Sequence, residues 1–464
     1  MVLRLSSGVR ALSPLALLAG SIAACVASCA TGTGLGETTS SASSSESASS
    51  SVSSASSAGS GGAASSSTAG SGGASSSGGM GGGGMGGSGT GGSAGDAGSD
   101  AGDAGSDAGD GGADAGDAGD DAGDGGTTSG VVVMLAGSGT QILAGEFHPG
   151  AGWTTTTLTG ATNDGLAVTL TGPTAGIGVI RSTANGGEVR FTSWSPGAWT
   201  ALAALGAGVT TRATPALTAS GAAASLVFHG DDFKHYFAAH STSWAPVAEQ
   251  VGGSAAQSFG PSPASIATLG TDAVITFAGN NNDLYDQTRS GGTWQAAHGH
   301  ALGATVTLTP AIVALTSGPD LLIAFVRSSD ARIVYTTRAA NVWSAPAPID
   351  TNALSNDPVS IAALPGGEAV LAYRGQNGKT YWSRYKPTAT PAWTPPTGIS
   401  ATNFDTPSTP AVAPGIGGVD AEMVFIDGAT GAAKHARLTG TTWSSPLTIG
   451  GSGLTRAGVA SNPN

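Results

Sequence analysis

Short apolar segments separated by polar turns fill the chain from residue 131 onward. A typical stretch has an apolar run at 321–325, polar residues at 328–330 and an alternating segment at 332–337. A short apolar run between turn residues predicts a strand buried on both faces, and alternation predicts a strand that is buried on one face. The pattern therefore predicts an all-β domain over residues 131–464.

Tryptophan marks a period of 45 to 50 residues in this domain. The seven periodic residues are Trp153, Trp199, Trp244, Trp294, Trp343, Trp393 and Trp443. A proline followed by a small or apolar residue opens five of the units, at Pro215-Ala216, Pro263-Ala264, Pro310-Ala311, Pro358-Val359 and Pro410-Ala411. Seven units of four short strands predict a seven-bladed β-propeller, in which the repeated tryptophans pack one sheet against the next.

The two ends of this domain complement each other. Residues 131–153 align without a gap to 321–343, so the first unit starts at its second strand. The segment 454–460 resembles 308–314, which is a first strand elsewhere. We expect this C-terminal strand to close the first blade, because closure removes exposed sheet edges.

Composition changes sharply before residue 131. Residues 30–130 contain a serine tract, a Gly/Ser tract and an Ala-Gly-Asp repeat, with twelve acidic and no basic residues. Such a segment has little apolar surface to offset its ordering entropy, so 25–130 is predicted to be a disordered linker. The rest of the net charge of −13 is spread thinly, because residues 131–464 hold 18 acids and 15 bases. This balance argues against a nucleic-acid partner.

The first 24 residues have the pattern of a secretory signal peptide. Arg4 and Arg10 precede an apolar run that is too short to span a bilayer. Ile22-Ala23-Ala24-Cys25 resembles the lipobox of bacterial lipoproteins, with Cys29 as the alternative lipidation site. We therefore expect an exported protein, lipid-anchored at the outer membrane or cell surface. An ordinary cleaved signal with incidental cysteines is the alternative.

The late tryptophan of several units is followed by proline, as in Trp244-Ala245-Pro246 and Trp443-Ser444-Ser445-Pro446. Seven repeats of this kind resemble the bacterial seven-bladed propeller lectins and are similar to the six-bladed fucose lectins of fungi. The resemblance covers residues 131–464. It implies that monosaccharides bind in clefts between blades, against aromatic side chains and with arginine, glutamate or backbone groups on the hydroxyls.

Two positions in the repeat fit that chemistry. An aromatic slot 8 to 11 residues before the tryptophans holds Phe191, Tyr236, Tyr285, Tyr335, Trp382 and His435, with Gly145 breaking the series. A polar slot after the second strand holds Arg181, His229, Arg327, Arg374 and Asp427. Packing between blades and solvated surface are the respective alternatives. Trp194 departs from the period and is expected to be an exposed ligand candidate. The predicted carbohydrate-binding residues are Arg181, Trp194, His229, Tyr236, Tyr285, Arg327, Tyr335, Arg374 and Trp382.

Other chemistry finds weaker support. His298-Gly299-His300 and the group of His229, Asp231, Asp232 and His235 hold metal-ligand types, but they fall at expected blade turns, so no metal, cofactor or catalytic residue is predicted. The turns before Trp294 and Trp443 lack the aspartate typical of sialidases. The leading hypothesis is a non-catalytic, lectin-like carbohydrate-binding surface protein. A protein-interaction propeller in the cell envelope is the alternative, and a degenerate sialidase-like glycan hydrolase is the third candidate.

Overall fold

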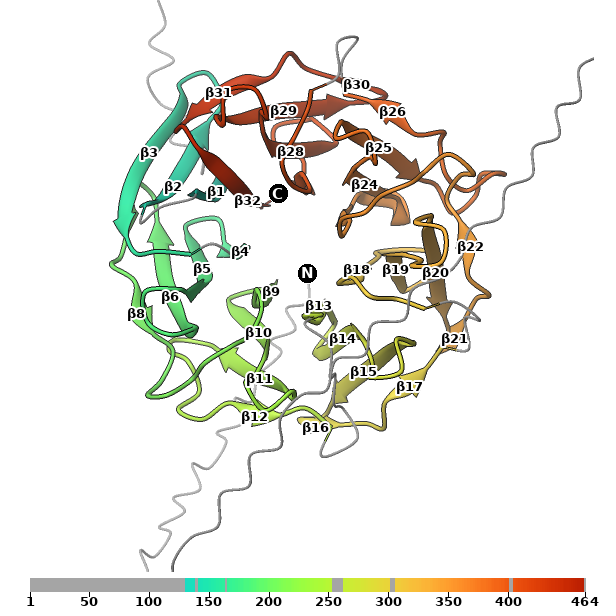
Figure 1. Ribbon diagram of the computed structural model, residues 1–464, viewed down its shortest axis with the longest axis horizontal. Coiled ribbons are helices and arrows are strands. Elements are labelled where there is room, and N and C mark those ends of the chain that lie inside the picture. Colours follow the sequence, from blue (N-terminus) through green and yellow to red (C-terminus); the bar gives the residue numbers. More distant parts are fainter. Residues whose placement is uncertain are drawn as a thin grey trace, which may run out of the picture. The chain divides into compact units, whose positions relative to one another are not determined.

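Seven antiparallel sheets surround a common centre (Figure 1). The computed structural model describes residues 130–462 except 138–140, 163–164, 253–261, 301–304 and 400–403. Within these ranges the predicted seven-bladed β-propeller is confirmed. The predicted signal peptide 1–24, the lipidation sites Cys25 and Cys29, and the linker up to residue 129 lie outside the described residues.

The blades are numbered here by the order of their tryptophans, and their strands run outward from the centre. Blade 1 contains β32 (Leu454–Ser461), β1 (Val131–Gly137), β2 (Gln141–His148) and β3 (Gly152–Thr159). Blade 2 contains β4 (Leu166–Gly172), β5 (Ala175–Ser182), β6 (Glu188–Ser195), β7 (Ala198–Trp199) and β8 (Ala203–Ala204). Blade 3 contains β9 (Ala216–Ser220), β10 (Ala223–His229), β11 (His235–His240) and β12 (Glu249–Gln250).

The remaining four blades repeat this order. Blade 4 contains β13 (Ser265–Leu269), β14 (Asp272–Ala278), β15 (Leu284–Ser290), β16 (Thr293–Trp294) and β17 (His298–Gly299). Blade 5 contains β18 (Ala311–Ala314), β19 (Leu321–Val326), β20 (Ile333–Ala339), β21 (Val342–Trp343) and β22 (Ala347–Pro348). Blade 6 contains β23 (Ser360–Ala363), the 3₁₀ turn η2 (Pro365–Gly367), β24 (Ala369–Arg374), β25 (Thr380–Tyr385) and β26 (Thr397–Gly398). Blade 7 contains β27 (Ala411–Pro414), β28 (Ala421–Ile426), β29 (Ala433–Thr439), β30 (Thr442–Trp443) and β31 (Leu447–Gly450).

The second strand of each blade is the most deeply buried. Every residue of β1, β19 and β28 is buried, because a neighbouring sheet covers each face of the blade. Such strands need apolar side chains at consecutive positions, which explains the continuous runs in the sequence. Third strands such as β20 alternate buried and half-buried residues.

The hydrophobic core is divided among the seven gaps between blades. Each gap holds one periodic tryptophan, from Trp199 between blades 1 and 2 to Trp153 between blades 7 and 1. The predicted packing role of these tryptophans is therefore confirmed. Each sheet buries its faces against the neighbouring sheets, so a single blade would have no core of its own.

The C-terminal strand closes the ring as predicted. Strand β32 pairs antiparallel with β1, from Val131 opposite Ser461 to Ala136 opposite Arg456. The alignment of 131–153 with 321–343 is gapless in total length, but the strand pairing differs by one residue within it. Phe147 pairs with Val131, 16 residues away, whereas Arg338 pairs with Leu321, 17 residues away. The next hairpin restores the spacing with one extra residue.

Candidate functional site

Three blades share one hairpin between their second and third strands. In each, an aromatic residue is followed by glycine two positions later, Asp or Asn after two more, and tyrosine after another four. We call this arrangement the tyrosine hairpin. Its three copies span Phe228–Tyr236 in blade 3, Phe277–Tyr285 in blade 4 and Tyr373–Tyr381 in blade 6.

The backbone of the tyrosine hairpin is the same in all three copies. In blade 6 the Gly375 N–H donates to the Lys379 carbonyl at 2.8 Å, and the Gly378 N–H donates back to the Gly375 carbonyl at 2.9 Å. Equivalent pairs of bonds occur in blades 3 and 4. The residue just before the accepting carbonyl residue has a positive φ in each copy: 64° at Phe233, 62° at Asn282 and 79° at Gly378. Each copy is a tight turn that ends in a residue with left-handed backbone conformation. Glycine and asparagine adopt this conformation most readily.

The side chains of the hairpin also repeat. The tyrosine ring stacks on the aromatic ring across the strand pair, with centroids 5.5, 5.8 and 5.6 Å apart in blades 3, 4 and 6. Its hydroxyl donates to Asp232 at 2.8 Å in blade 3, and it accepts from Asn281 at 3.1 Å and from Asn377 at 2.9 Å. The ring is thus fixed in direction by a stack on one side and a hydrogen bond at its tip.

The glycine of the hairpin makes room for the tyrosine ring. A Cβ at Gly230, Gly279 or Gly375 would lie 2.7, 2.5 or 2.7 Å from the tyrosine Cε2. Carbon atoms do not approach this closely without displacing one another. Blades 5 and 7 have Val334 and Lys434 in place of the tyrosine, and neither has glycine at the same point of the hairpin.

A cleft opens beside the tyrosine hairpin of blade 6. It has a volume of about 380 Å³ and lies between blades 5 and 6. Its lining consists of Asp350, Asn352 and Leu354 from blade 5, and Tyr373, Gly375, Gln376, Asn377, Tyr381, Pro395 and Pro396 from blade 6. Two tyrosine rings, two prolines, one carboxylate and three side-chain amides therefore meet in one concave surface.

The polar groups of this cleft keep free hydrogen-bonding capacity. Because the Tyr381 oxygen accepts from Asn377, its own proton remains available to a ligand. One oxygen of Asp350 accepts the Asn352 N–H at 2.7 Å, and the second oxygen can accept another donor. Burial, with smaller effects from Tyr381 and Asp350, raises the pKa of Tyr373 far above its ordinary value, so its phenol stays neutral.

The tyrosine of the blade 3 hairpin has a carboxylate, Asp232, as its hydrogen-bond partner, where blades 4 and 6 have the amides of Asn281 and Asn377. Burial alone would raise the pKa of Asp232. Hydrogen bonds from Tyr236 and the Lys234 N–H, together with the Lys234 charge, hold it below its ordinary value. Burial and the same hydrogen bond raise the pKa of Tyr236.

A second cleft lies at the opposite end of the strands, between blades 3 and 4. It is larger, at about 590 Å³, and most of its lining is Ala, Ser and Thr, together with the rings of Phe237, His240 and Trp244. Its cation, Arg289, already pairs with Glu249 at 3.0 Å. The cleft between blades 5 and 6 differs in its polar lining, because it brings one carboxylate and three side-chain amides beside its two tyrosine rings.

The predicted site residues of the aromatic slot separate into two groups. Tyr236 and Tyr285 belong to tyrosine hairpins. Tyr335 and Trp382 lie on the opposite face of their strands and contact the tryptophan of the next blade, with ring centroids 5.6 Å from Trp393 and 5.8 Å from Trp443, respectively. The aromatic slot was defined by its distance in sequence from the following tryptophan. It combined residues from both faces of the strands because the loops before the tryptophan differ in length. It also selected Trp382 instead of its neighbour Tyr381.

The polar slot holds structural contacts. Arg181 and Arg374 donate from Nε to the carbonyls of Thr211 and Thr406, at 2.7 and 2.6 Å. Each bond ties a second strand to the segment that leads into the next blade. Arg327 binds Asp330 within its own hairpin.

Two expectations about exposure are wrong. His229 has no exposed surface, although a rim position was expected. Trp194 is only 3% exposed, and its indole N–H donates to Glu146 at 3.3 Å across the gap between blades 1 and 2. Trp194 pairs with Trp199, at the position that Arg338 holds in blade 5, so it is a regular residue of the third strand.

The hairpin residues that sequence analysis missed carry a readable signal. The pattern of an aromatic residue, glycine, Asp or Asn, and tyrosine at fixed spacing recurs three times, and comparing the turns with one another would have revealed Tyr373, Asn377 and Tyr381. The cleft partners Asp350 and Asn352 carry no such signal, because they come from the adjacent blade.

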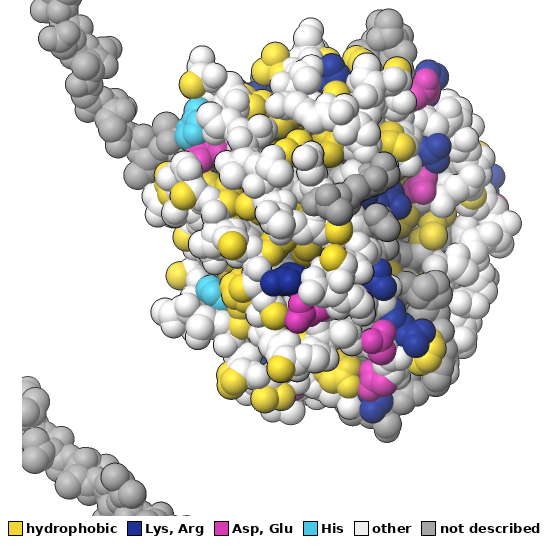
Figure 2. Space-filling view, turned by 60° about the vertical axis from the view of Figure 1, so that its left-hand side comes forward, with side chains coloured by type: hydrophobic (Ala, Val, Ile, Leu, Met, Phe, Trp, Pro, Cys, Tyr) yellow, Lys and Arg dark blue, Asp and Glu magenta, His cyan; other side chains and the backbone are white. Residues whose placement is uncertain are grey.

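Charged side chains on the surface are mostly paired. Figure 2 shows basic and acidic groups side by side on one face, without a broad patch of one sign among the described residues. Examples are Arg327 with Asp330, and Arg384 with both Glu368 and Asp420. Such a surface does not favour a highly charged polymer as ligand.

No protein-family model and no curated protein matches this sequence. Among solved structures, the fucose-specific lectin of Aleuria aurantia is similar, with 13% identity and a TM-score of 0.43 over 62% of this chain and 96% of that chain. AofleA of Arthrobotrys oligospora has 12% identity and a TM-score of 0.45 over 64% and 88%. The periplasmic gluconolactonase of Pseudomonas aeruginosa has 11% identity and a TM-score of 0.50 over 71% and 98%. At this level of identity the gluconolactonase shares a propeller fold with this chain.

Proposed function

We propose that this protein binds carbohydrate through its propeller, without catalysing a reaction, and that the cleft between blades 5 and 6 is a binding site. The observation that carries the proposal is the fixed ring of Tyr381 in a cleft with Asp350, Asn377 and Gln376. A sugar ring presents an apolar C–H face and a rim of hydroxyls. An aromatic ring suits the first, and a mixed set of donors and acceptors suits the second.

The size and exposure of the cleft agree with this class of ligand. About 380 Å³ lies within the range of small-molecule sites and accommodates one or two sugar units. Gln376, Asn377 and Asn352 are exposed, so an incoming ligand meets them without rearrangement of the core. A hydroxyl-rich ligand can bind both the acid and the amides, because each of its hydroxyls donates and accepts.

A protein partner is the alternative, and the surface gives it less support. That role predicts one broad apolar patch on the ring. The large hydrophobic side chains that stand exposed in the described ranges are Val247, Val342 and Leu447, and each belongs to a different blade.

A glycan array tests the proposal with the full chain carrying Cys25→Ser and Cys29→Ser, so that lipid cannot confuse the result. We expect selective binding to neutral glycans. Asp350→Asn and Tyr381→Ala should each weaken binding at least tenfold by titration calorimetry. The matched control is Tyr335→Phe, in the same gap between blades but outside the cleft lining, and it should bind as the wild type does.

Different outcomes would contradict different parts of the proposal. Silence across fucosylated, mannosylated and bacterial glycans would exclude carbohydrate binding. Equal loss in Tyr335→Phe and Asp350→Asn would place the site elsewhere. Cleavage of the bound glycan, seen as new reducing ends, would overturn the non-catalytic part.

We propose further that the protein is exported and lipid-anchored at the outer membrane or cell surface through Cys25, with Cys29 as the alternative. The signal-like segment and the lipobox resemblance support this. No helix in the described ranges is long and apolar enough to cross a membrane. Labelled palmitate should be incorporated, and the double change Cys25→Ala and Cys29→Ala should abolish labelling and release the protein from membranes, since acyl chains supply the affinity. Unchanged membrane association in the double variant would refute the anchor.

A further inference from the structure

The gap between blades 4 and 5 differs in chemistry from the gaps that follow it. In blades 5 and 6 the third strand directs an aromatic residue at the tryptophan of the next blade, namely Tyr335 at Trp393 and Trp382 at Trp443. The register places Asp286 at this position in blade 4. A carboxylate thus stands where blades 5 and 6 have an aromatic ring, and it is only 5% exposed.

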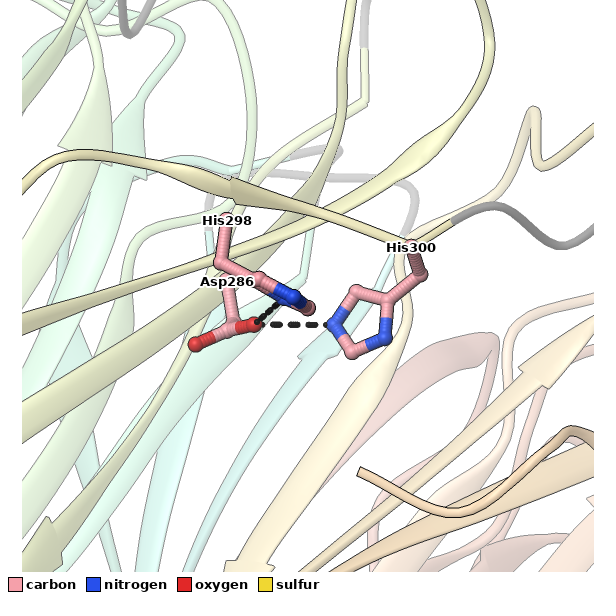
Figure 3. Close-up of side chains that lie close together, drawn as sticks. All are labelled: Asp286, His298 and His300. Atoms are coloured by element: carbon pink, nitrogen blue, oxygen red, sulfur yellow. Dashed lines mark hydrogen bonds and ion pairs between the residues drawn. The ribbon is translucent and has the colours of Figure 1, made fainter. Parts of the chain in front are cut away.

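Two histidines surround this buried carboxylate. Asp286 Oδ1 lies 3.1 Å from His298 Nδ1 and 2.9 Å from His300 Nε2 (Figure 3). Strand pairing explains the convergence, because His298 on β17 is directly opposite Asp286 on β15, and His300 follows two residues later on the same side. The facing atoms of the three residues all lie within 4.8 Å of one another.

Burial fixes one side of this cluster and leaves the other open. His300 is 6% exposed and packs against Trp343, with ring centroids 4.8 Å apart. The His298 side chain is 57% exposed and can adjust its position. No Lys or Arg side chain pairs with Asp286 within the described ranges, so the two imidazoles supply its ion-pair contacts.

We propose that Asp286, His298 and His300 form a binding site for one divalent transition-metal ion, of which Zn²⁺ fits best. Zinc takes histidine nitrogen and carboxylate oxygen at about 2.0 to 2.2 Å, so neighbouring ligand atoms lie roughly 3.0 to 3.5 Å apart. The two distances to Asp286 already approach this separation. Three protein ligands leave a fourth position for water or another oxygen ligand, on the exposed side of His298.

The ion would replace the present hydrogen bonds at the same atoms. Each neutral imidazole would bind it through the nitrogen that now faces Asp286 and carry its proton on the other ring nitrogen. The ion would join β15 to β17 and, through the contact of His300 with Trp343, support the packing of blade 4 on blade 5. This site lies in a different gap from the carbohydrate cleft and does not depend on it.

Equilibrium dialysis tests the proposal with the full chain carrying Cys25→Ser and Cys29→Ser, which removes both thiols. We expect one Zn²⁺ per chain bound with micromolar or tighter affinity at pH 7.5, and a higher melting temperature in its presence, because ligands stabilise the state that binds them. Asp286→Asn and His298→Ala should each weaken binding at least tenfold. His148→Ala is the matched control, because His148 also pairs with a carboxylate, Glu146, at 3.2 Å.

Cobalt supplies a second readout on the unmodified cluster, independent of how any variant folds. Co²⁺ bound by two imidazoles and a carboxylate should show visible absorption well above that of the hydrated ion, and Zn²⁺ should abolish it. Absence of such a spectrum, or of stoichiometric zinc in the wild type, would overturn the site. Zinc retained equally by Asp286→Asn, His298→Ala and the control would also overturn it.

Discussion

Gly375 shows how a single residue can shape the proposed site. The Tyr381 ring occupies the space that any side chain at position 375 would need. The ring in turn stacks on Tyr373 and receives Asn377 at its hydroxyl, so one missing Cβ allows an aromatic wall and an amide to take fixed positions. The same dependence holds in blades 3 and 4.

Gly375→Ala should therefore destabilise the protein and weaken glycan binding. The new Cβ would force the ring from its stack, a type of overpacking that costs about 1 to 3 kcal/mol. Gly172→Ala is the control, since a Cβ there meets nothing within 4 Å. Urea unfolding and calorimetric titration measure the two effects. Equal behaviour of the two variants would contradict the packing role of Gly375.

Asp232 makes the stability of the blade 3 hairpin depend on pH. Its pKa is lowered in the folded state, from an ordinary value of 3.8. Its contribution to stability is therefore fully present above that value and is lost as the pH falls through the lower folded value. Asp232→Asn, which imitates Asn281 of blade 4, should lower the slope of stability against pH between about 5 and 2. Urea midpoints across this range provide the measurement, and parallel profiles for the two proteins would refute the assignment.

The limits of sequence reasoning are clearest for single residues. Trp194 looked like an extra aromatic residue because its partner Glu146 lies 48 residues away, in another blade. Tyr381 and Trp382 are neighbours in sequence but point to opposite gaps, which loop lengths before Trp393 concealed. Asp286 carried no visible link to His298 and His300, since only strand pairing brings them together.

At the scale of elements, the closing strand and the side-chain contacts between blades 7 and 1 hold the ring together. Strand β32 covers the inner edge of β1. In the adjacent gap, the fully buried Glu422 contacts His435 at 2.8 Å and Arg437 at 3.2 Å, and His435 accepts the indole N–H of Trp153 at 3.3 Å. The last and first blades thus contact each other through a polar chain of hydrogen-bonded side chains as well as through apolar packing. The repeat predicted the closure itself, because it showed which strand the first unit lacked.

Removal of residues 454–464 should lower the melting temperature by 10 °C or more. Deletion exposes both β1 and the inner faces of its neighbours, and several kcal/mol shift the melting point of a domain of this size by about that amount. A truncation after Ser461 serves as the control because it leaves β32 intact. Calorimetric melting compares the three proteins. A melting temperature unchanged by the longer deletion would mean that closure contributes little stability.

Glu422→Leu should destabilise the ring by about 3 to 5 kcal/mol, because it leaves a buried histidine and a half-buried arginine without their carboxylate. Glu249→Gln removes a more exposed acid from Arg289 and should cost about 0 to 1 kcal/mol. Chemical denaturation gives both free energies. Equal small losses would show that the polar chain is not needed for closure.

Across the whole molecule, the near balance of charge in the propeller constrains its ligands. Residues 131–464 hold 18 acids and 15 bases, and many of them pair locally. Recognition in the cleft between blades 5 and 6 consequently rests on short-range contacts.

Glycan affinity should therefore change less than twofold between 50 and 500 mM NaCl. Salt screens interactions between separated charges and leaves hydrogen bonds and ring contacts to a neutral sugar nearly unaffected. Binding isotherms at the two salt concentrations provide the test. A tenfold or larger loss at high salt would indicate a polyanionic ligand and contradict a neutral one.

The pairing of β32 with β1 also orders events in time. Thr455 and Ala136, which the closure brings into contact, are 319 residues apart in the chain. Ribosomal synthesis delivers β1 long before β32, so β1 lacks its inner partner strand until the end of the chain has been made. Pairing between strands so far apart in sequence slows folding, and the unpaired edge of β1 is a template for strands of other chains. A chain that has not yet paired β32 with β1 therefore presents an open edge to other strands.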